Sequence, residues 1–318
     1  MTYPSSPLWL RRTAGLAISG LLVLTTAPAT AADDTTVKFG VPPWGGVEAK
    51  TAIVVNILEP LGYETEQISA SAPVIYEGLA KGDVHINMSA WAPGQAPTFM
   101  PHVEEGTVIK LGENLKGAIA GFAVPAHVHE AGLTKAKQLR DYADKVDRTV
   151  FCIDPGSGAN DVVNKAIDND IYGLNDWDIL ESSTAGMLSR VGKAVENKEW
   201  IIFCGWRPHW MNVKYDMHYL DDPQDLWGPN GGESTVFTLA NASFPENQPD
   251  LAEFFRRFTV DASVQSAWLF ESGQQERGLG EIADDWISDN LDTVEKWVDH
   301  MKGPEGQDAM TVLRAEYQ

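Results

Sequence analysis

Two hydrophobic patterns alternate in the first third of the chain. Residues 37–41 and 84–88 are short apolar runs typical of buried strands, and residues 63–68 alternate apolar and polar side chains. Between these runs, apolar positions recur at helical spacing over residues 45–58 and 74–80. Because this β-α-β-α-β order requires crossover connections, it predicts a right-handed parallel sheet.

The same alternation of strand and helix patterns recurs in the middle of the chain. Residues 149–153 and 200–204 are continuous apolar runs, which predict strands buried on both faces. Helical patterns cover residues 133–142, 161–168 and 184–196. This block therefore predicts a second α/β unit.

Two segments connect the units, and a helical region follows them. Residues 117–124 are predicted to be an apolar crossing segment with little regular structure, and residues 231–232 and 234–240 offer a way back to the first unit. The last part of the chain is expected to be helical, over residues 251–259, 262–271, 281–288 and 293–301. We therefore expect two α/β lobes joined by a double crossover: lobe I comprises residues 32–120 and 232–318, and lobe II residues 121–231.

Three tryptophans stand just after three of the predicted strands. Trp44, Trp91 and Trp206 follow the runs that begin at residues 37, 84 and 200. In open α/β sheets, ligands bind at the carboxyl ends of the strands. We expect these three side chains to line one pocket, the alternative for each being ordinary core packing. Indole faces suit a methylated ammonium group, which cannot donate strong hydrogen bonds.

Charge and the first residues predict the compartment. Arg11 and Arg12 precede an apolar stretch, and a small-residue cleavage pattern ends at Ala31, so residues 1–31 read as a secretory signal peptide. The formal net charge of −21 argues against nucleic acid or an anionic membrane as partner. We expect an exported, periplasmic monomer.

The chain has two cysteines, Cys152 and Cys204, each inside a predicted strand. In an oxidising compartment two cysteines on neighbouring strands form a disulfide, whereas the alternative is two small buried thiols. The sequence leaves both open, because adjacency of the strands is not visible in it.

The turn over residues 154–160 is a second candidate contact for a ligand. Its backbone N–H groups open a predicted helix and can hold a carboxylate or another oxygen, and the Asn160 side chain lies beside them in the sequence. The alternative for Asn160 is a plain helix cap. Asp161 stands where a dinucleotide-binding glycine pattern needs its third glycine, so a nucleotide site is not expected.

Other candidate chemistry is weaker. His127 and His129 have metal-like spacing but no partner cluster, and Glu130 either balances a bound cation or simply opens the next helix. No G-x-S-x-G or H-E-x-x-H pattern occurs in the sequence. We expect no cofactor and no enzyme. An exported enzyme acting on a methylated amine is the second hypothesis, and a metal carrier the third.

With these residues in hand, the chain resembles the glycine betaine- and choline-type substrate-binding proteins of ABC importers. The resemblance covers nearly the whole chain after residue 31. It rests on residues 37–44, 57–65 and 181–188, on Trp91-x-Pro93 and Asp154-Pro-Gly156, and on Gly205-Trp206-x-Pro208-His209-x-Met211-Asn212. It implies the two-lobed periplasmic-binding-protein fold (type II-like), with a methylated ammonium held in an aromatic box between the lobes. It also implies a membrane permease as the partner.

Two departures from the choline-binding branch concern the ligand. Gly46 stands where that branch has an Asp, and Ala120 where it has a box Tyr. Phe122, Trp177 or Trp210 could complete the box, and we favour Trp210 because it follows Trp206 by four residues. The resemblance then favours trimethylamine N-oxide or glycine betaine over choline and carnitine. Trimethylamine N-oxide is preferred because no Arg or Lys is evidently placed for a carboxylate.

Overall fold

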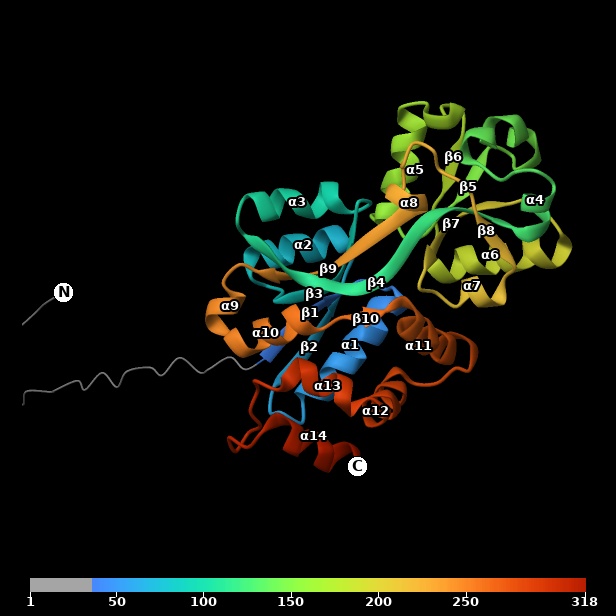
Figure 1. Ribbon diagram of the computed structural model, residues 1–318. Coiled ribbons are helices and arrows are strands. Elements are labelled where there is room, and N and C mark those ends of the chain that lie inside the picture. Colours follow the sequence, from blue (N-terminus) through green and yellow to red (C-terminus); the bar gives the residue numbers. More distant parts are fainter. Residues whose placement is uncertain (1–35) are drawn as a thin grey trace, which may run out of the picture. The chain divides into compact units, whose positions relative to one another are not determined.

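The computed structural model describes residues 36–318, so the predicted signal peptide, residues 1–31, lies outside the described part. Mixed α/β structure is built on one curled sheet with the strand order β2-β1-β3-β9-β4-β7-β5-β6, and β8 and β10 add to β4 (Figure 1). Among the described residues, no helix is long and apolar enough to cross a membrane.

The β-α-β-α-β order of the first unit forms as predicted, and the helix α3, which was not predicted, follows it. Strand β1 pairs in parallel with β2 on one side and with β3 on the other. Helices α1 and α2 are the crossovers, since each follows one strand and precedes the next. The bounds are β1 (Thr36–Val41), α1 (Gly45–Leu58), β2 (Glu64–Ser69), α2 (Ala72–Lys81), β3 (Ile86–Ala92) and α3 (Ala96–Glu104).

Residues 117–124 are regular, which corrects the expectation of a weakly structured crossing. They belong to β4 (Val108–Pro125), which runs antiparallel to β9 (Glu233–Asn241) through three register shifts. The end of β4 pairs instead with β7 and β8. Because β4 has partners along its whole length, its backbone groups are satisfied as a strand. Figure 1 shows β4 and β9 side by side.

The second unit repeats the parallel arrangement. Strand β5 lies between β6 and β7 and runs parallel to both. Residues 133–142 were expected to form a helix, but the helix is of the 3₁₀ type and begins at Ala136, after Gln138 has accepted N–H groups of Thr134 and Lys135. The bounds are α4 (Ala126–Glu130), η1 (Ala136–Lys145), β5 (Thr149–Phe151), α5 (Gly158–Asp168), η2 (Ile171–Gly173), β6 (Asp178–Leu180), α6 (Thr184–Asn197), β7 (Ile202–Arg207), α7 (Met211–Lys214), β8 (Met217–Tyr219) and α8 (Pro229–Gly232).

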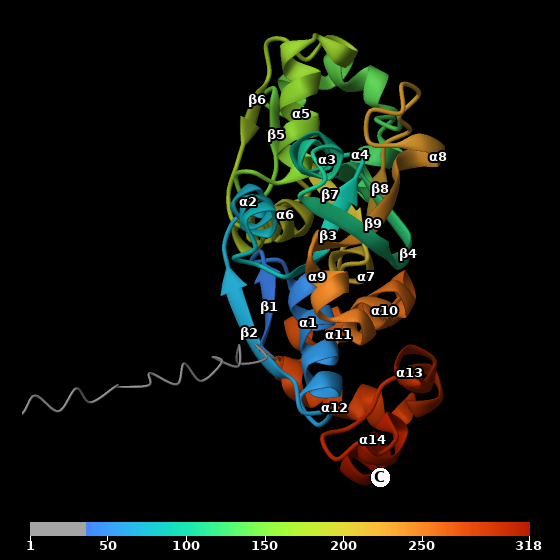
Figure 2. The ribbon, with the colours of Figure 1, turned by 90° about the vertical axis from the view of Figure 1, so that its left-hand side faces the viewer.

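The C-terminal region is helical, as the pattern predicts, and two of its helices in the described chain, α9 and α14, were not predicted. Helices α11 and α12 pack against α1, which ties the end of the chain to its first unit (Figure 2). The bounds are α9 (Phe244–Asn247), α10 (Pro249–Arg257), β10 (Val260–Asp261), α11 (Ala262–Gln274), α12 (Leu279–Asp289), α13 (Leu291–Val298) and α14 (Ala309–Tyr317).

The buried apolar side chains form separate clusters along the same division. Two clusters take their members from residues 37–118 and 236–313. Two others take theirs from residues 122–227. Separate cores are what two lobes need. The exact lobe boundaries, at residues 120/121 and 231/232, stay a prediction.

Candidate functional site

Trp44, Trp91 and Trp206 line one cavity together with Trp227. Trp44 follows β1, Trp91 is the last but one residue of β3, and Trp206 is the last but one residue of β7. The cavity therefore lies at the carboxyl ends of these strands, where the α/β rule places ligands. The structure thus brings together the three tryptophans that the sequence singled out.

Local hydrogen bonds hold the backbones of Trp44 and Trp91, the two cavity tryptophans of the first unit, in place. Trp44 precedes α1, and its carbonyl oxygen accepts the N–H of Val47 at 3.0 Å, so its position is fixed by the start of the helix. The N–H of Trp91 donates to Oε1 of Gln95 at 2.8 Å. Backbone contacts of this kind leave both indoles free to face the cavity.

Trp206 is held by a brace from the turn after β7. Nδ2 of Asn212 donates to the carbonyl oxygens of Trp206 at 2.8 Å and of His209 at 2.9 Å. Oδ1 of the same amide accepts the hydroxyl of Tyr219 at 2.8 Å. These three hydrogen bonds join both ends of the turn to Tyr219 of β8, so a shift of the turn would break them. Asn212 therefore positions Trp206 and His209 together.

His209 lines the cavity as a neutral hydrogen-bond donor. Only 6% of the residue is exposed, and burial lowers the pKa of its imidazole to about 3. Its Nδ1 accepts the N–H of Met211 at 3.2 Å, so the proton of the neutral ring is on Nε2. The rings of Trp206 and His209 pack edge-to-face, with their centroids 5.0 Å apart. The site thus offers an uncharged N–H beside an indole.

The start of α5 supplies further donors. Ser157 caps the helix, because its Oγ accepts the N–H of Asn160. The next two residues, Gly158 and Ala159, line the cavity. Helix geometry leaves the N–H groups of these first positions without an intrahelical acceptor, and the helix dipole favours an anion there. The N–H groups of this turn are therefore able to hold an oxygen with negative charge.

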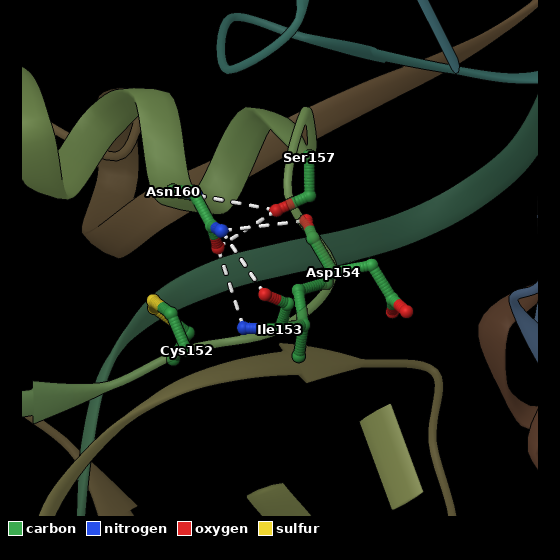
Figure 3. Close-up of a disulfide and its surroundings, with 6 residues drawn as sticks. Cys152, Ile153, Asp154, Ser157 and Asn160 are labelled. Carbon is green, nitrogen blue, oxygen red and sulfur yellow. Dashed lines mark hydrogen bonds between the residues drawn. A yellow bond between two sulfur atoms is a disulfide. The ribbon is translucent and has the colours of Figure 1, made fainter. Parts of the chain in front are cut away.

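Asn160 does not line the cavity, in contrast to the expectation that it contacts the ligand. Its side-chain amide is used internally (Figure 3): Nδ2 donates to the carbonyl oxygens of Ile153 and Asp154, and Oδ1 accepts from Ser157 and Ile153. It is 1% exposed. Asn160 therefore shapes the turn that presents Gly158 and Ala159, and its role is structural.

Two other candidates are also away from the cavity. Trp210 is outside the lining residues, because the helical turn after Pro208 directs it against Tyr215 and Gly273 instead. Glu130 ends the short helix α4, in the second unit, and does not line the cavity. A spacing of four residues from Trp206 was thus a poor guide, since the two side chains leave the turn in different directions.

Trp227 is the fourth tryptophan in the lining of this cavity, and the sequence analysis did not single it out. It is buried, lines the cavity and packs edge-to-face on Phe122, with ring centroids 5.2 Å apart. Phe122 and Trp177, the other candidates for this place, lie in the core behind it. A signal was available: Trp227 precedes Gly228 and Pro229, much as Trp91 precedes Pro93 and Gly94.

Gly46 and Ala120 line the cavity, as expected from their places in the sequence. A Cβ on Gly46 would lie 2.5 Å from Nε2 of Gln265, so α11 already fills the space that a side chain would need. Gln265 is 2% exposed, and its Oε1 has no hydrogen-bond partner in the described residues. We call Trp44, Trp91, Lys50, Gln95 and Gln265 the first wall, and Trp206, His209, Ser157, Gly158 and Ala159 the second wall.

Lys50 is the charged member of the first wall. It is 2% exposed, and its Nζ donates to the carbonyl oxygen of Met88 at 2.6 Å and to Oδ1 of Asn114. Asn114 in turn donates to Met88 and Thr238, which links β3, β4 and β9. Burial lowers the pKa of the Lys50 ammonium to about 7. Within the described part of the chain, no Asp or Glu side chain lines the cavity.

Cys152 and Cys204 form a disulfide in the structure, with their Cα atoms 5.0 Å apart. Cys152 directly follows β5 and Cys204 lies in β7, the neighbouring strand. The bridge therefore joins β7 to the segment that leads into the turn of residues 154–157, and Figure 3 draws Cys152 next to Ile153.

The two histidines with metal-like spacing point to separate partners. Nε2 of His127 lies 3.1 Å from the carbonyl oxygen of Glu199, and His129 stacks on His218. Within residues 36–318, no group of three or more His, Cys, Asp or Glu side chains is placed to hold a metal ion.

Comparisons with known proteins agree with this architecture. Residues 35–289 match the family model OpuAC, described as the substrate binding domain of ABC-type glycine betaine transport systems. A solved choline-binding protein of an ABC transporter, in complex with choline, is 28% identical with a TM-score of 0.86, over 90% of this chain and 99% of that one. Lactococcal OpuAC complexed with glycine betaine is 25% identical with a TM-score of 0.75, over 82% of this chain and 98% of that one.

A curated relative from Listeria monocytogenes, the glycine betaine/carnitine transport binding protein GbuC, is 31% identical over 173 residues, or 53% of this chain. The match spans about half of that protein, 55% of its length. The family model covers most of the chain, and the two-lobed fold agrees with it. This chain therefore belongs to the family of substrate-binding domains of ABC-type glycine betaine transport systems.

Proposed function

We propose that this protein captures a trimethylammonium zwitterion with a carboxylate, glycine betaine above all, and delivers it to a membrane permease. The observation that carries the proposal is that the cavity presents two kinds of contact, aromatic faces and uncharged N–H donors. Four indoles line it, and on the second wall His209 and the start of α5 offer uncharged N–H groups. Indole faces attract a quaternary ammonium, and the N–H groups suit a carboxylate.

The uncharged donors change the preference that the sequence alone gave. Trimethylamine N-oxide was favoured because no Arg or Lys was evidently placed for a carboxylate. His209, Gly158 and Ala159 line the cavity, and N–H donors and a helix start hold a carboxylate without a cationic side chain. Trimethylamine N-oxide and carnitine remain candidates with lower expected affinity: the N-oxide has a single oxygen for these donors, and carnitine has a longer chain between its ammonium and its carboxylate.

Choline is disfavoured by the same lining. Choline carries a net positive charge and a hydroxyl that donates, whereas no Asp or Glu lines the cavity. Gln265 occupies the space beside Gly46 where a carboxylate side chain would have to stand. A zwitterion brings its own negative charge, so the site need not supply one.

We propose a periplasmic monomer that turns over no ligand. The expected mechanism is closure of the two lobes: the ligand bridges the first and second walls, and the closed form docks on the permease. The signal-peptide pattern of residues 1–31 supports export, and membership of a family of transport binding proteins supports binding without catalysis.

Calorimetric titration of the purified protein with glycine betaine, choline, carnitine and trimethylamine N-oxide tests the proposal. Glycine betaine is expected to bind most tightly, and chemical analysis of the ligand after incubation is expected to show no turnover. Tighter binding of choline than of glycine betaine contradicts the assignment of the ligand. Absence of binding by all four contradicts the aromatic box.

A further inference from the structure

Lys50 is a buried charge that the proposed binding mode does not use. It lies on α1, lines the cavity and contacts the ligand-facing strand β3 through the carbonyl oxygen of Met88. Its two hydrogen-bond acceptors, Met88 and Asn114, are both neutral. A buried ammonium without an anionic partner is costly, so its retention in a cavity wall calls for a reason.

Among the described residues, no anionic side chain forms a hydrogen bond or an ion pair with Lys50. Its partners are Met88 from β3 and Asn114 from β4, Asn114 donates in turn to Thr238 from β9, and Gln265 from α11 lines the same cavity; none of these groups ionises. On α1 itself, Glu48 is the nearest acidic residue in sequence, and it does not line the cavity. His209, across the cavity, is neutral.

We propose that Lys50 is a specificity-determining residue whose ammonium makes the cavity reject trimethylammonium ligands with a net positive charge and accept net-neutral zwitterions. This inference rests on the proposed function and names the class of substrate by its net charge. A fixed charge repels a net cation over the whole length of the cavity. On a zwitterion, attraction of the carboxylate offsets repulsion of the ammonium, so the net effect is small.

The test compares choline with glycine betaine, because both carry the same trimethylammonium group and differ in net charge. The measured quantity is the affinity for choline divided by the affinity for glycine betaine, at about pH 6, where Lys50 is charged. In Lys50→Met this ratio is expected to rise at least about tenfold over wild type. The rise is expected to come from tighter choline binding.

A second variant keeps the hydrogen bonds of Lys50. Gln265→Glu places a carboxylate in the same wall with almost unchanged shape, and it is expected to raise the choline ratio by a similar factor. Gln275→Glu adds the same charge at an exposed position just after α11 and is the matched control, with an expected change below about twofold.

Wild type offers a third test without mutation. Raising the pH from about 6 to about 8.5 removes the Lys50 charge, while His209 stays neutral throughout because its pKa is about 3. Neither ligand titrates in this range. The choline ratio is expected to rise with pH in wild type and to stay flat in Lys50→Met.

The outcomes separate the inference from the proposed function. If wild type binds glycine betaine but the ratio is unchanged in both Lys50→Met and Gln265→Glu, the inference is wrong and the proposed function stands. If wild type binds choline more tightly than glycine betaine at about pH 6, both are wrong. If Lys50→Met does not fold, the pH series in wild type decides.

Discussion

The two walls of the cavity differ in the polar groups that they present beside their tryptophans. The first wall combines Trp44 and Trp91 with buried polar groups, which include the ammonium of Lys50 and a glutamine oxygen that has no hydrogen-bond partner within residues 36–318. In the second wall, Trp206 stands beside N–H groups that are uncharged and rigidly held by Asn212 and Asn160. The first wall therefore presents a buried cation to the cavity, whereas the second wall presents uncharged N–H groups, and our proposals assign exclusion of net cations to the first and carboxylate recognition to the second.

The difference between the walls also appears in what stabilises each of them. A disulfide between Cys152 and Cys204 fastens the strands below the second wall. The first wall relies on the hydrogen-bond network of Lys50, Asn114 and Thr238, which contains a titratable group. We expect changes in redox state to affect the second wall and changes in pH to affect the first.

The largest effect is expected from loss of the disulfide. In Cys152→Ala/Cys204→Ala, the free energy of unfolding is expected to fall by about 4 kcal/mol, because the bridge closes a loop with a sequence separation of 52. Urea unfolding with the ligand absent measures this. Glycine betaine affinity of the folded variant is expected to stay within about threefold of wild type; an unchanged unfolding midpoint would show that the bridge contributes nothing.

Removal of the second-wall indole comes next. Trp206→Ala is expected to weaken every trimethylammonium ligand about 100-fold, since a cation–π contact and a large buried face are lost together. Trp210→Ala is the matched control, because this neighbour lies outside the cavity, and its effect on affinity is expected to stay below about threefold. Calorimetry on both variants decides, and equal losses would refute the placement of the wall.

The first wall is expected to make stability depend on pH. The folded-state pKa of Lys50, about 7, is lower than that of an exposed lysine, so the unfolded chain binds an extra proton above pH 7. Stability therefore increases with pH from about 7 toward the unfolded pKa, by about 2 kcal/mol between pH 7 and 9 from this group. Urea unfolding across this range in wild type and Lys50→Met measures it; parallel curves for the two proteins would assign the slope to other groups.

The smallest effect is expected from the donor of the second wall. His209→Ala is expected to weaken glycine betaine about tenfold by removing the Nε2 donor, and to leave choline within about threefold, since choline has no carboxylate. His209→Gln, which keeps an N–H donor, is expected to recover part of the loss. A uniform loss for both ligands would mean that His209 only supports Trp206 by packing.

Local pattern predicted most of the framework. The strands before Trp44, Trp91 and Trp206 and the helices between them were predictable because burial on one face or both leaves a periodic trace in the sequence. The rule that ligands bind at the carboxyl ends of parallel strands then predicted that the three indoles line one cavity. These inferences need only the order of residues a few positions apart in the sequence and one topological rule.

The sequence by itself thus determined the fold class, the family resemblance and three of the four cavity tryptophans. Tertiary structure alone decided that Trp227 lines the cavity while Trp210 does not, and that Cys152 meets Cys204. It also turned Asn160 inward and placed Lys50 at the cavity without an anionic partner. The physical reason is common to all of these: the direction of a side chain after a turn, and the partner that it meets, depend on segments that are distant in sequence.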